Sequence, residues 1–486
     1  MTMFAQHEWC GLHDNDILIE RLLSNKKYLK EIGIEATKNV VSYVPVKYHI
    51  IGREDLSGRV SPKRVLDMHC TLNEFYAEDG EGIQFYIKDG FSYIDNTTAY
   101  ENHASFAGQV QFTNNRDPNA VNIFIPRDAN IPNGPDIGVV LGYYSPQLDW
   151  IVIRKADANR SSFTAPHELG HFFSLPHPFN GWESSAFNGS GMAPATSPGG
   201  IPTEKMDGSN CETSGDFICD TPPSYLFFSS QTCNYNGGAL DPCGVLVDPD
   251  ELNVMDYFPD NCSPKILSQG QKDLINADFA QRTSLQTNFT PPALSIASAP
   301  TIIQPVDDAT TSGFDQVIFE WDPVAGADRY LLEIDRLSSF DLDPYIQVVH
   351  GTQRDLFGIF EPDRTYHWRV TPFNEYYTCA PSTATNRFTT GLSTNTNNVL
   401  EVNALEINPN PVSQDNIMIT IDTPDAFDGN ISIVSLTGQT LRTISHHFAV
   451  GNSALEMNIG NIPNGMYLVN VRSGDKIINK KIIVAK

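Results

Sequence analysis

The chain has 486 residues, which is too long for one ordinary hydrophobic core, so we expect two to four domains. It carries 58 acidic against 32 basic residues, a formal net charge of -26 at pH 7. That balance excludes the basic footprint that nucleic-acid binding requires, so we predict no nucleic acid among its partners. No apolar run is long enough to span a bilayer, so we predict no transmembrane segment.

The first part of the chain, residues 1–42, is a charged leader in which Asp16–Leu23 has helical spacing. The opening residues lack both a basic region and a full apolar run. We therefore expect no complete signal peptide in this chain.

The next part predicts an α/β layer. Val44–Ile51 alternates like a strand, and Ser61–Ala77 has an apolar helical face behind a serine cap and a proline in the first turn. Further strands are expected at residues 82–87, 121–125 and 150–153. This order of strands and helices is typical of an α/β domain.

The stretch Thr164–Gly181 carries the residues with the clearest chemistry. His167 and His171 are four apart, so on a helix both imidazoles lie on one face and can hold one metal ion. Glu168 could take a proton from a metal-bound water. His177 stands between two prolines, where the chain turns back and supplies a third nitrogen. Three protein ligands leave the fourth position of a tetrahedral zinc open, as in catalytic sites.

About eighty residues downstream, the chain reads Asn-Val-Met-Asp-Tyr over residues 253–257. The two stretches together resemble the metzincin signature, with a Met-turn after the histidine motif. Over residues 44–285 the sequence resembles the pappalysin-like family of secreted metalloproteases. The resemblance implies that Met255 is an apolar floor beneath the zinc and that Tyr257 helps to hold the oxyanion. Ser174 stands where the pattern has glycine, so we expect a sharp turn made at some cost.

The same resemblance gives roles to other segments. A strand within 140–153 should edge the cleft, where an extended substrate could pair with it. The leader would be a propeptide, in which the thiolate of Cys10 could block the zinc as a cysteine switch. A disulfide, for example with Cys70, or a free thiol is the alternative for Cys10. Calcium is the second implied ion, with an Asx-turn cluster as the alternative; its candidate ligands are Asp216, Asp220 and Thr221.

Five of the eight cysteines lie between residues 211 and 262, in a segment rich in Gly, Pro and Asn. A closed zinc site is the competing interpretation, but the spacings lack a Cys-x-x-Cys pair. We therefore predict disulfides and an oxidising compartment.

The remaining chain predicts two all-β domains. Residues 299–392 contain short strands between Asp, Pro and Gly turns, with a Trp and Tyr pattern that resembles a fibronectin type III sandwich. Residues 403–486 open with Asn-Pro-Asn-Pro and end in a basic, then apolar strand. They resemble the C-terminal sorting domain of proteins exported by the type IX secretion machinery of Bacteroidetes-type bacteria, which would then be a partner.

The predicted fold is multidomain, with an α/β (α+β) metzincin-like zinc protease domain over 43–288 followed by two all-β sandwich domains. The predicted function is a secreted or outer-membrane-surface zinc endopeptidase, monomeric, acting on proteins or peptides, with Zn²⁺ and possible Ca²⁺ as cofactors. One alternative is a secreted or surface binding protein that uses an inactive metalloprotease scaffold. Another is a structural zinc closed by a fourth ligand such as Cys10.

Overall fold

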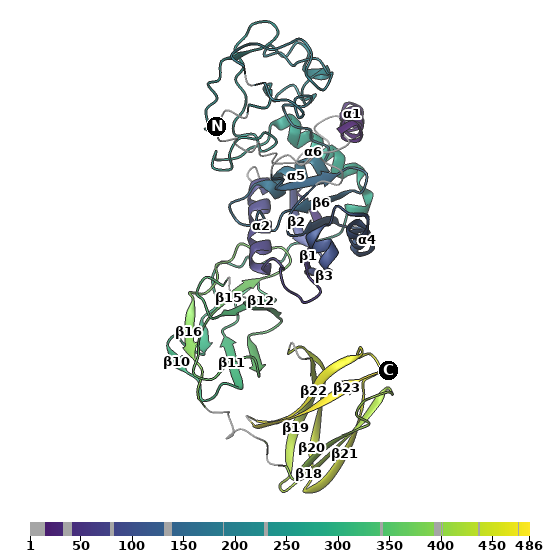
Figure 1. Ribbon diagram of the computed structural model, residues 1–486, viewed down its shortest axis with the longest axis vertical. Helices are drawn as coiled ribbons and strands as arrows, with labels where there is room; N and C mark the ends of the chain where they lie inside the picture. Colours follow the sequence, from purple (N-terminus) through teal and green to yellow (C-terminus); the bar gives the residue numbers. More distant parts are fainter. Residues whose placement is uncertain are drawn as a thin grey trace. The chain divides into compact units, whose positions relative to one another are not determined.

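A computed structural model describes residues 15–32, 41–77, 82–130, 139–187, 189–227, 232–340, 344–392, 400, 402–435, 438–474 and 476–486. The chain divides into two compact units (Figure 1). The first is Met1–Ser298 with Val324–Leu331 and Thr371–Pro381; the second is Ala299–Pro323, Leu332–Val370 and Ser382–Lys486.

A mixed sheet lies at the centre of the first unit. The long β1 (Ser42–Gly52) pairs in parallel with β2 (Ile83–Ile87) and β3 (Ser92–Asp95) along one side, and with β4 (Val121–Ile125) along the other. β6 (Trp150–Ile153) continues the sheet in parallel. β5 (Gly142–Ser145) pairs antiparallel with β6 and forms the edge, which confirms an edge strand in this part of the chain.

Helices cover both faces of this sheet (Figure 1). On one face are α3 (Thr97–Glu101) and α4 (Phe106–Asn115), where Phe112 stacks on Phe124 with ring centroids 4.0 Å apart. On the other are α2 (Pro62–Ala77) and α5 (Thr164–Phe172), joined by a hydrogen bond from Tyr76 to the carbonyl of Pro166. Neighbouring residues of β5 point to opposite faces, and Tyr144 is the one that meets α5, through Phe172.

The helix predicted in the leader is present and longer than expected, as α1 (Asn15–Ile32). It packs beside α6 (Gln269–Gln281), with Leu18 and Leu22 fully buried. The amide nitrogen of Asn25, also buried, donates to Asp278 Oδ2 at 2.8 Å and to Ser174 Oγ at 2.7 Å. This part of the leader is therefore built into the first unit.

Between residues 178 and 266 the described backbone has little regular structure. It contains β7 (Gly191–Met192), the 3₁₀ turn η2 (Cys211–Thr213) and β8 (Ala239–Leu240); a second 3₁₀ turn, η3 (Thr283–Leu285), follows α6. The disulfides Cys211–Cys219 and Cys233–Cys262 cross-link the segment, which confirms the disulfide prediction, while Cys243 is free and exposed.

One disulfide corrects an expectation. Cys70 of α2 pairs with Cys379, which belongs to a segment of the first unit 309 residues further along the chain. The alternative in which Cys70 pairs with Cys10 is therefore wrong. Cys10 itself lies outside the described residues.

A β-sandwich follows residue 299, with sheets ordered β10-β16-β15-β12-β13 and β14-β11-β9. Its core contains the fully buried Trp321, Trp368 and Phe319. The strands are β9 (Ile302–Gln304), β10 (Ala309–Thr310), β11 (Gln316–Trp321), β12 (Arg329–Asp335), β13 (Tyr345–Val349), β14 (Gln353–Phe357), β15 (Thr365–Phe373) and β16 (Asn386–Thr389).

A second sandwich ends the chain, with antiparallel sheets ordered β17-β18-β21 and β20-β19-β22-β23. Isoleucine and valine side chains fill the space between the sheets. The predicted final strand is present and lies at a sheet edge. The strands are β17 (Ala404–Asn408), β18 (Asn416–Thr423), β19 (Phe427–Ser435), β20 (Thr440–Phe448), β21 (Gly451–Asn458), β22 (Gly465–Ser473) and β23 (Lys476–Val484).

Candidate metal centre

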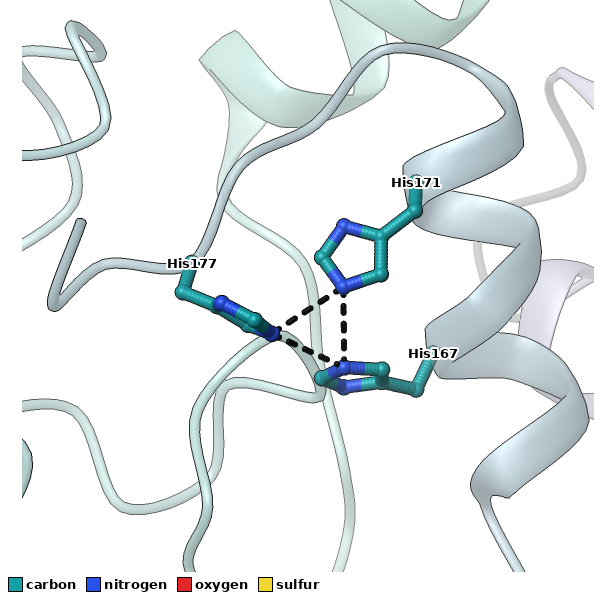
Figure 2. Close-up of side chains that lie close together, drawn as sticks. All are labelled: His167, His171 and His177. Atoms are coloured by element: carbon teal, nitrogen blue, oxygen red, sulfur yellow. Dashed lines mark hydrogen bonds between the residues drawn. The ribbon is translucent and has the colours of Figure 1, made fainter. Parts of the chain in front are cut away.

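Three imidazoles meet at one point (Figure 2). His167 and His171 project from one face of α5, and His177 comes from the segment that turns back after the helix. The Nε2 atoms lie 3.1 Å (His167 to His171), 3.0 Å (His171 to His177) and 3.3 Å (His177 to His167) apart. Three nitrogens bound to one tetrahedral zinc at about 2.0–2.1 Å would be about 3.3 Å apart, so this cluster fits that ion.

The other ring nitrogens set the tautomers. His167 Nδ1 donates to the carbonyl of Val254 and His171 Nδ1 to the carbonyl of Leu175, each at 2.7 Å. A ring that donates through Nδ1 presents the lone pair of Nε2, which is the form that binds a metal. Burial lowers the pKa of His167 to about 4. Burial also lowers the pKa values of His171 and His177 well below the usual one, and for these two residues the neighbouring imidazoles add to the effect.

The turn between the second and third histidines is made at Ser174. Its φ is +68°, in the left-handed region where the metzincin pattern has glycine. Two backbone hydrogen bonds close the end of the helix. Ser174 N donates to the carbonyl of His171, and Leu175 N donates to the carbonyl of Gly170. The serine therefore makes the expected turn, and the hydrogen bond from Asn25 fixes its hydroxyl.

Met255 lies against the helix beside the cluster. Met255 is fully buried. A Cβ on Gly170 would come within 2.3 Å of the Met255 Sδ, so the thioether can pack this closely against the helix only because residue 170 is glycine. The turn that presents Met255 is held by Asn253, whose Oδ1 accepts from Met255 N at 3.0 Å and whose Nδ2 donates to Gln271 at 2.9 Å. Gln271 belongs to the capping box that starts α6.

A small pocket opens beside His167. Glu168, which is fully buried, lines it together with Tyr257 and Leu141. The Tyr257 ring lies 5.0 Å from the His177 ring and 5.8 Å from the His167 ring, centroid to centroid. The structure therefore places the predicted base and phenol next to the histidine cluster. Within the described residues, no fourth His, Cys, Asp or Glu joins the three histidines as a ligand.

Glu183 is a neighbour of the cluster that the sequence did not single out. Its Oε1 lies 3.7 Å from His177 Nδ1. Burial raises the pKa of Glu183 to about 7; the whole side chain is 33% exposed, but Oε1 itself is buried. No periodicity or motif marks this residue.

The candidate calcium residues separate into two groups. Asp216 is fully buried and accepts from the hydroxyl of Thr221 at 2.8 and 2.9 Å, whereas Asp220 accepts from Ser268 and from the backbone of Gly270 and so caps α6. A further acid, Glu204, was not predicted. Burial raises the pKa of Glu204 to about 9, with the charge of Asp216 adding to it, and burial raises that of Asp216 to about 7.

Comparison with known proteins concerns mainly the end of the chain. A family model described as "Secretion system C-terminal sorting domain" matches residues 406–485, so the second sandwich is a sorting domain of this kind. No curated protein matches the chain. No helix among the described residues is both long and apolar enough to cross a bilayer.

Two solved structures are similar to part of the chain. The FN1–FN3 domains of chicken CNTN1 share 12% identity at a TM-score of 0.16, over 38% of this chain and 67% of that one. An α-L-rhamnosidase from Dictyoglumus thermophilum shares 13% identity at a TM-score of 0.18, over 39% of this chain and 29% of that one. At these scores neither structure supports an argument about fold or function.

Proposed function

We propose that the first unit is a zinc-dependent endopeptidase of the metzincin, pappalysin-like type, and that the sorting domain directs its export. The observation that carries the proposal is the convergence of three buried imidazole Nε2 atoms. Carbonyl oxygens orient the imidazoles of His167 and His171 from behind. Three ligands with no fourth among the described residues is the donor set of a catalytic zinc.

Each residue has a distinct role in this proposal. Bound zinc supplies a Lewis acid and lowers the pKa of a water to about 7. The carboxylate of Glu168 takes a proton as water attacks the scissile carbonyl and returns it to the leaving amine. The phenol of Tyr257 donates to the oxyanion. Met255 and Gly170 keep the floor of the site packed and apolar.

The substrate would bind along β5, an edge strand beside the pocket. A Cβ on Gly142 would lie 3.1 Å from the Cγ of Glu168, so the start of this strand is directly next to the proposed base. An extended peptide that pairs with the strand would bring a backbone carbonyl close to the metal ligands. This arrangement suits a protein or peptide substrate bound through its backbone.

The test is metal content by mass spectrometry on the wild type and on His177→Ala, with casein hydrolysis assayed alongside. We expect one zinc per wild-type chain, and we expect the variant to lose both the zinc and the activity. Zinc that survives His177→Ala would contradict the three-histidine site. Wild-type zinc without hydrolysis, even after the leader is cut, would favour the binding-scaffold alternative.

We also propose a calcium ion at Asp216 and Thr221, with Glu204 beside them. Two buried carboxyl groups whose charges repel each other, as those of Asp216 and Glu204 do, are costly unless they are protonated or a cation lies nearby. Added Ca²⁺ should therefore raise the unfolding temperature of the zinc-loaded wild type by several degrees, measured by calorimetry. Asp216→Asn should remove that response, and an equal response in both proteins would contradict the site.

Export is the proposed role of the sorting domain, through the type IX machinery of a Bacteroidetes-type bacterium to the cell surface or the medium, and we expect the exported protein to be a monomer. Without residues 403–486, the protein should stay in the periplasm of such a host and not cross the outer membrane. Cell fractionation measures this. Normal release of the truncated chain would contradict this role.

A further inference from the structure

We propose that Glu183 is a positioning residue for the third metal ligand, His177. This inference rests on the proposed zinc site and goes beyond it. The Oε1 atom of Glu183 lies 3.7 Å from His177 Nδ1, and both atoms are buried. Within the described part of the chain, neither atom has a hydrogen-bond partner. A slight closing of this gap would give each atom the other as its partner.

The other two ligands show why an acceptor is needed at this place. His167 and His171 each donate through Nδ1 to a backbone carbonyl at 2.7 Å, so the main chain holds their rings. Around His177 the structure places aromatic rings instead. Phe179 stacks on it at 4.4 Å and Tyr257 lies at 5.0 Å, centroid to centroid. Glu183 Oε1 faces this nitrogen and can accept from it.

A tight turn brings Glu183 to His177. The backbone N–H of Gly181 donates to Glu183 Oε2 at 2.7 Å, which leaves Oε1 to face the imidazole. Gly181 has a φ of +91°, and a Cβ there would come within 2.5 Å of Ser197 Oγ. The backbone of this turn is therefore fixed by packing, and the carboxylate belongs to the fixed part.

The expected consequence is stronger metal binding. A carboxylate behind a ligating imidazole fixes the tautomer and the ring orientation and makes Nε2 more basic. It also offsets charge, because three neutral imidazoles leave the two positive charges of zinc uncompensated in a buried site. Loss of such a partner costs about 10–100-fold in metal affinity.

The experiment measures the zinc affinity of the full chain by competition with a chromophoric chelator, in the wild type, Glu183→Ala and Glu183→Gln. Asp207→Ala is the matched control, because Asp207 also accepts a backbone N–H two residues away, from Ser209 at 2.9 Å, and is exposed. We expect Glu183→Ala to bind zinc about 10–100-fold more weakly, Glu183→Gln to fall between it and the wild type, and Asp207→Ala to match the wild type.

Two further measurements separate a positioning role from a loss of folding. Unfolding of the metal-free proteins shows whether Glu183→Ala still folds; if it does not, the isosteric Glu183→Gln decides, and wild-type affinity in that variant overturns the proposal. The visible spectrum of bound Co²⁺ should change in the Glu183 variants, which a purely structural role would not cause. A wild type that binds no zinc contradicts the proposed function itself, whereas wild-type zinc with unchanged affinity in both Glu183 variants contradicts only the role of Glu183.

Discussion

The metal-site loops and the sorting domain are stabilised by different means. Residues 178–266 have little regular structure and are held by turns and by the disulfides Cys211–Cys219 and Cys233–Cys262. The sorting domain has no cysteine, since Cys379 is the last in the chain. Its long strands pair along their lengths, as β22 and β23 do, over a core of isoleucine and valine.

The difference follows from the role proposed for each part. In the proposed enzyme, metal ligands and a general base must approach one point from several directions, which a continuous strand ladder does not allow. An irregular backbone allows this convergence. Few of its N–H and C=O groups pair in regular hydrogen-bond ladders, so it depends on disulfides and on side chains that cap the free groups. A domain that only directs export does not need side chains to converge on one point, so regular strands are sufficient. The two regions should therefore respond to different substitutions.

Replacement of the proposed base should affect only the first region. Glu168→Ala should keep its zinc and lose about 10²–10⁴-fold in casein hydrolysis, because the remaining groups cannot take the proton from water. The measurement is turnover per bound zinc. A protein cut after residue 402 is the control, and it should keep full turnover. Turnover near normal in Glu168→Ala would refute the mechanism.

A cavity in the sorting domain should affect only the second region. Ile433 is fully buried in β19, so Ile433→Ala should lower the free energy of unfolding of that domain by about 2–5 kcal/mol. Urea unfolding followed by limited proteolysis would measure this. Zinc content and casein turnover should stay at wild-type values. A loss of either would show that the two regions depend on each other.

Removal of a cross-link should destabilise the loops. The Cys233–Cys262 disulfide closes a separation of 29 residues, and its loss in Cys262→Ser should cost about 2–4 kcal/mol. Urea unfolding of the zinc-loaded protein measures the change. Cys243→Ser is the matched control, because Cys243 is free and exposed in the same segment, and it should change stability by about 0.5 kcal/mol or less. Equal effects in the two variants would contradict a stabilising role for the disulfide.

The smallest effect is expected at Ser174. Ser174→Gly relieves a left-handed backbone that costs about 1–2 kcal/mol but deletes the hydroxyl that accepts from Asn25, worth about 1 kcal/mol. The net change in the free energy of unfolding should be within about 1 kcal/mol. Ser174→Ala loses the hydrogen bond and keeps the cost, so it should be the less stable of the two. The opposite order, measured by urea unfolding, would contradict the assigned strain.

The sequence predicted the parts of the site that depend on local spacing. The sequence itself shows two histidines four apart, a third histidine after a proline, and the Met-turn motif. The structure brings His167, His171 and His177 to one point. Strand alternation and helical spacing likewise predicted α1, β1, α2, β2, β4 and β6 of the first unit, whereas β3, α3 and α4 were not predicted. Capping residues and apolar periodicity act over one or two turns, so they are readable without the fold.

The contacts that the sequence missed depend on residues far apart or without a pattern. The Cys70–Cys379 disulfide spans 309 residues, so spacing could not reveal it. Asp220 belongs to an acidic cluster that suggested calcium, but its carboxylate caps a helix 50 residues later. Glu183 stands in a segment with no period, and its position beside a histidine depends on a turn set by Gly181.

The position of α1 has a consequence for the leader. The side chain of Asn15, the first residue of α1, donates to that of Asn180, three residues after His177. Cys10 is five residues before Asn15 in the sequence, so only a short tether separates it from the start of α1. A short tether gives an attached group an effective concentration on the order of millimolar. If Cys10 binds the zinc, dilution of the protein would not release it, and activation would require a cut in the leader or oxidation of the sulfur.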